Sequence, residues 1–196
     1  MSKDTRQVIL QSATEIFLQK GYNGCGLNEI LAAANVPKGS FYHYFESKEA
    51  LAKAVLEDYA NDTRTWFAEQ HEQSRKGAAL DVLWETLSAI RDQLVAKQFA
   101  GGCLLGTLAQ ELAGSNFDLV CYMKELFPRW EKQLGFFLES AVALGELPAD
   151  TNVPELSAYL LDTWEGAVLR ARLEKSPLPL DRFISYSKAM FARLKS

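Results

Sequence analysis

The stretch from residue 27 to residue 48, LNEILAAANVPKGSFYHYFESK, restricts the fold of this chain more than any other. Its first half repeats apolar residues at intervals of three and four, which gives one apolar face to a helix of about two turns. Pro37 is tolerated only outside a helix or in its first turn, so the chain must turn there and start again. The stretch therefore predicts two short helices joined by a tight turn. The residues on the first apolar face are Leu27, Ile30, Leu31 and Ala34.

The second short helix carries a cluster of aromatic residues. Phe41 and Phe45 are four residues apart, so both can point inward. Tyr42 and His43 then face outward, while Tyr44 can lie on either side. A helix-turn-helix places its second helix in the major groove of DNA. Two adjacent exposed rings after such a turn favour contact with DNA over a merely solvated helix face.

A third helix boundary follows at once. Ser47 is suited to cap the next helix, with Lys48 at the first helical position and Glu49 near the positive end of the helix dipole. This position would put Lys48 beside a backbone phosphate of bound DNA. Outside such a motif, Lys48 would be read as an ordinary surface lysine.

The run from Gly21 to Leu51 closely resembles the DNA-binding head of the TetR family of transcriptional regulators. The pattern KGxxYxxFxSKExL carries the resemblance. It departs from the family at Cys25 and Gly26, where Thr or Ser is usual, and this weakens the cap of the second helix. The resemblance places the family's DNA contacts on Lys38, Gly39, Ser40, Tyr42, His43 and Lys48.

The rest of the chain shows helical spacing and no segment that alternates like a strand, so the fold class is all-α. With 196 residues, 48% of them hydrophobic, the chain can bury a sizeable core. We expect a helix-turn-helix DNA-binding domain over residues 1–47 and an effector-binding and dimerisation domain over residues 48–196. By resemblance, the last two helices form a four-helix bundle with the same pair of a second copy.

The helix boundaries follow from caps, glycines and prolines. The first helix starts at Asp4 or Thr5 and ends at Gly21, and Pro128 is expected to kink a long helix. Pro177 and Pro179 are expected to separate the last two helices. The expected later helices span residues 47–70, 79–98, 103–113, 116–144, 154–176 and 180–194.

Net charge is -4, which looks wrong for a DNA-binding protein, but acidic and basic residues are nearly balanced over residues 1–48. Affinity must then come from a few phosphate contacts doubled by a dimer, and its salt dependence should be moderate. No run approaches the roughly 18 to 20 apolar residues of a membrane span, and the start lacks a signal-peptide core. The three cysteines lack metal spacing and fit a reducing compartment. We expect a soluble, cytoplasmic protein without cofactor or metal.

Cys103 is the strongest candidate site outside the head. It lies at or near the start of a short helix, where amide donors and the helix dipole favour a thiolate. The segment GGCLLG resembles a TetR subgroup that includes the repressor of N-ethylmaleimide reductase, whose cysteine senses electrophiles, and the acrylate-responsive regulators. Three interpretations stay open: a reactive sensor, an unreactive pocket-lining residue, or a small side chain that fills space in the core.

Four aromatic residues of the second half could line an effector cavity, although for each of them alone a place in the core is favoured. Arg170 and Arg172 could pair with an anionic effector, but a solvated or interface role is favoured. The four aromatic residues are Trp130, Phe137, Tyr159 and Trp164.

The inventory of reactive side chains argues against an enzyme. His43 and His71 are the only histidines, and there is no HExxH motif, glycine-rich phosphate loop or nucleophile elbow. The sequence therefore predicts a homodimeric repressor that a small-molecule or electrophile effector releases from a palindromic operator. Two alternatives stay open: a redox switch acting through Cys103, and a regulator that needs no ligand or that activates transcription.

Overall fold

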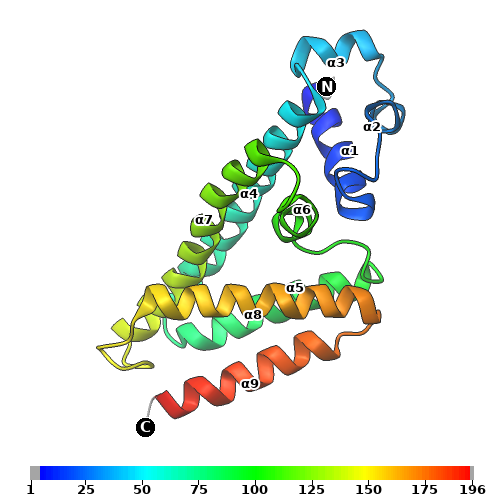
Figure 1. Cartoon of the computed structure of the whole chain (residues 1–196). Coiled ribbons are helices and arrows are strands. Elements are labelled where there is room, and N and C mark those ends of the chain that lie inside the picture. Colours follow the sequence, from blue (N-terminus) through cyan, green and yellow to red (C-terminus); the bar gives the residue numbers. More distant parts are fainter. Residues whose placement is uncertain (1–4, 195–196) are drawn as a thin grey trace. The chain divides into compact units, whose positions relative to one another are not determined.

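The computed structural model describes residues 5–194, and every regular element in that range is a helix, which confirms the all-α class (Figure 1). Asp4, one of the two predicted starts of the first helix, lies outside the described residues. Within this range no helix combines the length and the apolar character needed to span a bilayer. The helices are α1 (Thr5–Lys20), α2 (Leu27–Ala34), α3 (Lys38–Tyr44), α4 (Lys48–Ser74), α5 (Ala79–Ala96), α6 (Leu104–Leu112), α7 (Phe117–Ala143), α8 (Val153–Glu174) and α9 (Leu178–Leu194).

The chain divides into two compact units. The first unit contains the residues up to Asp62 and the segment Cys103–Leu126, and the second contains Thr63–Gly102 and the residues from Phe127 onward. The first unit therefore holds α1, α2, α3 and α6, and the second holds α5, α8 and α9. Helices α4 and α7 each begin in the first unit and end in the second.

The core of the first unit is built where α1 packs against α2 and α6. Phe17 of α1 and Phe41 of α3 are completely buried, and Phe45, the residue after α3, is buried with them. The inward direction predicted for Phe41 and Phe45 is confirmed. Other fully buried apolar residues of this unit are Ile9, Leu10, Ala13, Ile30, Leu51, Ala52, Val55, Leu56, Leu104, Leu108, Leu119 and Leu126.

The turn between α2 and α3 follows from its residue types. Asn35 closes α2 in the left-handed conformation, with a φ of 53°, which asparagine tolerates better than most residues. Pro37 precedes α3 with a φ of -62°, within the range that its ring allows. Gly26 precedes α2 without a side-chain cap, as the sequence predicted, whereas Ser47 Oγ accepts a hydrogen bond of 3.0 Å from the amide of Ala50.

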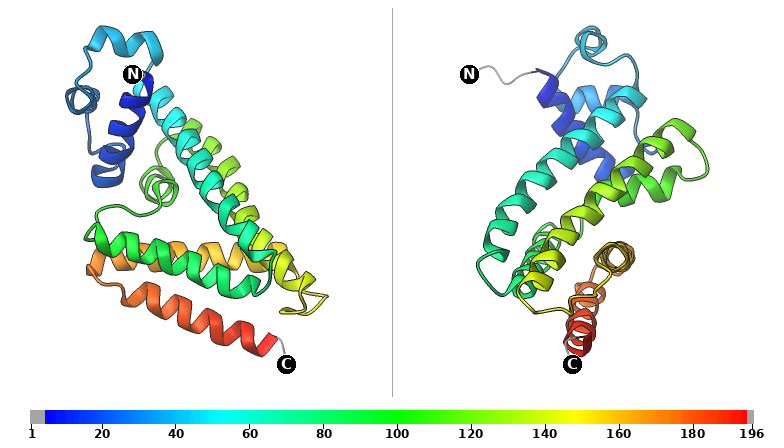
Figure 2. Two further views of the ribbon diagram at one scale, coloured as in Figure 1. Left: turned by 180° about the vertical axis from the view of Figure 1, so that it is seen from behind. Right: turned by 90° about the vertical axis from the view of Figure 1, so that its left-hand side faces the viewer.

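In the second unit, α8 and α9 run side by side, and α5 contacts α9 (Figures 1 and 2). Trp84 of α5 packs edge-on against Phe191 of α9, with ring centroids 5.2 Å apart. Trp164 of α8 meets Phe183 of α9 in the same manner at 5.4 Å. Edge-to-face aromatic contacts thus join α5 to α9 and α8 to α9.

Three predicted boundaries in the second unit differ from the structure. Helix α4 runs to Ser74, beyond the predicted end at residue 70, and the other two differ for local reasons. Helix α9 begins at Leu178, before Pro179, because proline fits the first turn of a helix, where its missing N–H has no helical partner to lose. Helix α5 ends at Ala96, before the predicted Gln98. Gln98 and Phe99 both have positive φ values, 51° and 59°, which no α-helix accommodates.

Candidate nucleic-acid interface

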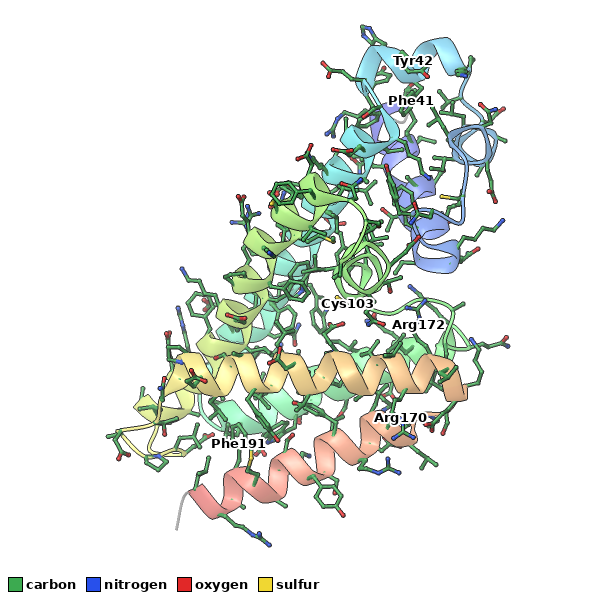
Figure 3. All side chains as sticks on the ribbon, in the orientation of Figure 1. Phe41, Tyr42, Cys103, Arg170, Arg172 and Phe191 are labelled. Atoms are coloured by element: carbon green, nitrogen blue, oxygen red, sulfur yellow. The ribbon has the colours of Figure 1, made fainter. Side chains whose placement is uncertain are left out.

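Helix α3 presents nearly all of its surface to solvent. Phe41 is its one buried residue, while the side chain of Tyr42 is 54% exposed (Figure 3). His43 is exposed too. Tyr44, which the sequence left on either side, is exposed at 37%. A seven-residue helix anchored by one phenylalanine therefore displays three adjacent rings.

The start of α3 is equally open. Lys38 and Gly39 are exposed, and Ser40 is half-buried. A Cβ added at Gly39 would meet no heavy atom within 4 Å, so the fold itself does not require glycine at this position. An absent side chain here leaves the backbone of α3 accessible to a partner.

Lys48, the first residue of α4, is anchored on the head itself. Its ammonium donates to the carbonyl oxygens of Tyr22 and Cys25 in the loop between α1 and α2. It also lies over the Tyr22 ring, 4.3 Å from the centroid. An ammonium has three N–H donors, and the two carbonyls take two of them. The predicted phosphate contact would therefore come from a lysine whose orientation is already fixed.

Glu111, in the last turn of α6, also binds this loop. Its Oε2 accepts from the amide of Tyr22 at 2.7 Å and its Oε1 from the amide of Asn23 at 2.6 Å. Glu111 is a site residue that the sequence patterns did not predict. A signal was available, because the helix dipole disfavours an acidic side chain in the last turn of a helix.

Cys25 is a structural cysteine. Its side chain is buried, and its thiol donates to the carbonyl of Gly21 at 3.4 Å. Burial raises the pKa of the Cys25 thiol, and the nearby Lys48 offsets this only in part. The thiol form is therefore favoured, and the group is a poor nucleophile.

Cys103 lies directly before α6 and caps it (Figure 3). Its sulfur accepts from the amide of Gly106 at 3.4 Å, and the Thr107 hydroxyl donates to its carbonyl at 2.8 Å. The side chain is half-buried, as is that of Cys121. The predicted position at the start of a short helix is confirmed, and the reactivity of the thiol stays a prediction.

The aromatic residues predicted to line an effector cavity occupy different environments. Phe137 is buried in α7, with its ring centroid 4.4 Å from that of His71. Trp130 of α7 and Trp164 of α8 are also buried. Tyr159, by contrast, is 48% exposed. It lines a surface groove between α8 and α9 rather than the interior.

This α8–α9 groove has a volume of about 600 Å³. Its walls include Phe183, Met190 and Tyr186, and the Tyr186 side chain is 74% exposed. Arg170 also lines it and pairs with Glu174 on its own helix, which satisfies its charge without an effector. The small residues Gly166 and Ala167 leave one wall shallow. Most of the lining side chains are apolar or aromatic, and a second arginine, Arg182, also lines the groove.

Arg172 does not line the α8–α9 groove, unlike Arg170, but lies next to Gly102 (Figure 3). A Cβ added at Gly102 would lie 2.9 Å from the Cδ of Arg172, so the arginine stem packs against a backbone that only glycine leaves open.

Among the described residues, no cluster of three or more His, Cys, Asp or Glu side chains is placed to hold a metal ion.

Two family models match the chain. Residues 9–55 match the model for bacterial regulatory proteins of the tetR family. Residues 79–187 match the model for the tetracyclin repressor-like C-terminal domain. The first match covers most of α1, all of α2 and α3 and the start of α4, and the second runs from the start of α5 into α9.

Relatives agree along nearly the whole chain. The transcriptional regulator AcuR of Cereibacter sphaeroides is 35% identical over 90% of this chain and 80% of its own. The HTH-type transcriptional repressor DhaR of a Mycobacterium species is 31% identical over 92% of this chain and 88% of its own. The HTH-type transcriptional repressor NemR of Escherichia coli is 30% identical over 96% and 94%.

Solved structures give the same result. The regulatory protein TetR of Rhodobacter sphaeroides has a TM-score of 0.81 and 34% identity, covering 95% of this chain and 96% of its own. The reduced form of E. coli NemR has a TM-score of 0.81 and 31% identity over the same shares. The open face of α3, the matching domain models and these relatives lead to one conclusion: the chain belongs to the tetR family and is a DNA-binding transcriptional regulator.

Proposed function

We propose that the protein is a homodimeric repressor whose two heads bind a pseudo-palindromic operator in successive major grooves, about 34 to 36 Å apart. The observation that carries this proposal is the outward face of α3, where Tyr42 and His43 are exposed above a single buried anchor, Phe41. Two of its relatives, DhaR and NemR, are transcriptional repressors. Such a protein acts on DNA in the cytoplasm.

Each residue of the reading surface has a distinct role in this proposal. Lys38, Ser40, Tyr42 and His43 contact bases or phosphates, and Gly39 lets the α3 backbone come close to DNA. Lys48 binds a backbone phosphate, supported by its anchorage on the α1–α2 loop. Contacts to phosphate fix the register, and contacts to base edges supply the specificity.

Residues 1–47 form the DNA-reading domain in this proposal, and residues 48–196 bind the effector and form the dimer. The α8–α9 groove is the dimer surface, because exposed apolar side chains beside small residues suit packing against the same pair of helices in a second copy. Tyr159 belongs to this surface by its exposure. Trp130, Phe137 and Trp164 remain the candidates for the effector cavity.

Effector binding changes the tilt of α4 and with it the separation of the two heads, so that the released dimer cannot engage both grooves. A coupling free energy of about 1–3 kcal/mol is typical between two such sites. It corresponds to a several-fold to hundredfold loss of operator affinity.

A thiol switch at Cys103 is the second candidate. The half-buried sulfur accepts an amide hydrogen bond at the amino end of α6, an environment that stabilises a thiolate. Oxidation or alkylation of this thiol would release DNA. We expect the Cys103→Ser variant to stay on the operator when an electrophile such as N-ethylmaleimide releases the wild type. Equal release of both proteins excludes Cys103 as the sensor.

The reading surface is tested with Tyr42→Ala. A duplex is first selected by the wild-type protein from a random pool, and its Kd is measured by fluorescence anisotropy. We expect Tyr42→Ala to lose operator binding while the dimer stays intact in sedimentation. The control is Phe117→Ala, which removes an aromatic side chain that is also exposed and lies outside the head. Unchanged binding by Tyr42→Ala would refute the assignment.

The dimer surface is tested with Tyr186→Glu, which places a charge in the α8–α9 groove. We expect sedimentation equilibrium to show a shift toward the monomer. Ser185→Glu adds the same charge at an exposed neighbouring position that does not line the groove. A Tyr186→Glu protein as dimeric as Ser185→Glu contradicts the proposed surface.

A further inference from the structure

One peptide group of the α1–α2 loop lies between a carboxylate and an ammonium. The peptide joining Tyr22 and Asn23 donates its N–H, on Asn23, to Glu111 Oε1 at 2.6 Å. Its C=O, on Tyr22, accepts from the ammonium of Lys48. A single rigid peptide plane therefore connects the last turn of α6 with the first residue of α4.

Both ends of this connection have a second hydrogen bond. Glu111 Oε2 accepts from the amide of Tyr22 at 2.7 Å, and the Lys48 ammonium donates to the carbonyl of Cys25 at 2.5 Å. Hydrogen bonds to ionised groups are stronger than neutral ones, and bonds in a chain polarise one another. The negative charge on the N–H side and the positive charge on the C=O side both align with the peptide dipole. Each charge thus strengthens the hold of the other.

The loop is shaped to receive the carboxylate. Gly21 has a φ of +75°, and a Cβ added there would lie 2.3 Å from Glu111 Oε2 and 2.9 Å from its Cδ. Any other residue at position 21 would both strain the backbone and displace the carboxylate. Glycine at this position is therefore required by the approach of Glu111 as well as by the turn.

Stability of α6 does not explain Glu111. The carboxylate lies in the last turn of α6, where it faces the negative end of the helix dipole. Its two partners are amides of a different segment, 88 and 89 residues earlier in the sequence. The position is unfavourable for the helix and favourable for the loop.

From this geometry we propose that Glu111 is a positioning residue for operator binding, which fixes Lys48 through the Tyr22–Asn23 peptide. The inference rests on the proposed function in one respect, namely that Lys48 binds an operator phosphate. Glu111 itself does not contact DNA in this proposal. It links the position of α6 to the position of Lys48 at the start of α4. Any displacement of α6 acts on Lys48 through one peptide plane.

The direction in which Glu111→Ala changes the operator affinity distinguishes the positioning role from a simple charge effect. Removing a carboxylate should, by charge alone, strengthen binding to a polyanion. Loss of positioning should instead weaken operator binding by Glu111→Ala by about tenfold, within the range typical of coupled sites. The salt dependence of log K should also become shallower by up to roughly two units, because one phosphate contact is lost in each head of the dimer.

Two controls accompany Glu111→Ala, both measured as full-length dimers on the duplex that the wild type selects. Glu125→Ala removes the same charge from an exposed position of α7 in the first unit. Glu111→Gln keeps one acceptor oxygen and should fall between Glu111→Ala and the wild type, which keeps the test available if the alanine variant folds poorly. If Glu111→Ala binds as tightly as Glu125→Ala, the positioning role is wrong.

A double-mutant cycle with Gly21→Ala tests the contact itself. The added methyl group should weaken operator binding strongly when Glu111 is present and less in the Glu111→Ala background, because the clash is gone there. Backbone strain at position 21 is present in both backgrounds and cancels in the cycle. Strictly additive effects would overturn the proposal.

Amide hydrogen exchange gives a readout that does not depend on DNA. In Glu111→Ala, the amides of Tyr22 and Asn23 should exchange faster than in the wild type, while those within α1 stay protected. Unchanged exchange at both amides contradicts the contact. A wild-type protein that enriches no duplex from the pool refutes the proposed function instead, so the two failures are distinguishable.

Discussion

Each unit of the molecule contains a glutamate that accepts hydrogen bonds from two consecutive backbone amides. In the first unit, Glu111 binds the amides of Tyr22 and Asn23. In the second unit, Glu146 binds those of Ala79 and Leu80, both at 2.9 Å. The carboxylate chemistry is the same, but the groups on the far side of the bound peptides differ.

Glu146 acts on the amino end of a helix. The amides of Ala79 and Leu80 open α5, where the dipole favours a negative charge. The carbonyl of Ala78, on the far side of the first peptide, accepts from Val82 within the same turn. The effect of Glu146 is therefore confined to α5, whereas that of Glu111 is passed to Lys48. The comparison indicates that the role of a backbone-binding carboxylate depends on the partner of the carbonyl in the same peptide. A partner within the same helix supports stability, and a partner in the DNA-binding surface supports function.

The largest effect should follow from Lys48→Ala. This change removes both a phosphate contact and the anchor on the α1–α2 loop, so operator binding should weaken by about 2–3 kcal/mol, the scale of hydrogen bonds to charged groups. The free energy of unfolding, measured with urea, should change less. Salt titration of the Kd should show a slope shallower by roughly two units, one for each head of the dimer. If the free energy of unfolding falls by more than the free energy of operator binding, Lys48 is mainly a stabilising residue like Glu146, and the proposed difference between the two units is wrong.

Glu146→Ala should have the next largest effect, on the opposite property. Loss of the cap at α5 should lower the free energy of unfolding by about 1–2 kcal/mol, because two helix N–H groups lose their acceptor. Urea unfolding measures this change, and anisotropy measures operator affinity on the folded dimer. We expect that affinity to stay at the wild-type value. A fall similar to that of Glu111→Ala would show that both carboxylates serve the same role.

Ala78→Gly should change the free energy of unfolding by a smaller amount and tests the backbone conformation next to the peptides that Glu146 binds. Ala78 precedes α5 in the left-handed conformation, with a φ of 54°, which costs an L-residue roughly 1–2 kcal/mol and glycine little. After the entropy that glycine loses on folding, the variant should be more stable by about 0.5 kcal/mol. Ala89→Gly, at an exposed position inside α5, should instead be destabilised by about 1 kcal/mol. Equal losses in the two variants would contradict the strain at Ala78.

A change of pH should have the smallest effect, through His71 in the second unit. Burial lowers the pKa of His71 below its ordinary value, and the hydrogen bond between Nε2 and the carbonyl of Gln133, 2.9 Å away, opposes this only in part. The unfolded chain then binds a proton more readily than the folded one. Stability from neutral His71 is fully present above about pH 6.5 and falls as the pH drops through the folded pKa.

Urea unfolding between pH 7.5 and pH 5.5 measures this loss. His71→Gln keeps an N–H donor for Gln133 but does not titrate, so its stability should depend less on pH in this interval. Parallel curves for the two proteins would show that His71 does not cause the acid sensitivity.

The helices of the head were predictable because their signals are local. The apolar spacing of α2, the proline before α3 and the serine before α4 each act within a few residues, and the structure confirms all three. The contact between Glu111 and the α1–α2 loop could not be derived in this way. Its partners are far apart in the sequence, and neither segment has a periodicity that encodes the other.

The candidate effector residues show a second limit of sequence patterns. Tyr159 and Trp164 are five positions apart on α8, which places them on different faces of a helix with 3.6 residues per turn. The spacing alone separates them, and the structure exposes Tyr159 and buries Trp164. Aromatic composition identified both residues, but only the packing of α9 against α8 determines which one is buried.

The proline in α7 removes one backbone hydrogen bond from that helix. Pro128 lies inside the helix, two residues beyond Leu126, which ends the first unit. It has no N–H to give to the carbonyl of Lys124, so the helical ladder lacks one rung at this boundary. A helix bends most easily where a rung is missing. Helix α7 therefore lacks one backbone hydrogen bond next to the boundary between the two units, whereas α4, which crosses the same boundary, contains no proline.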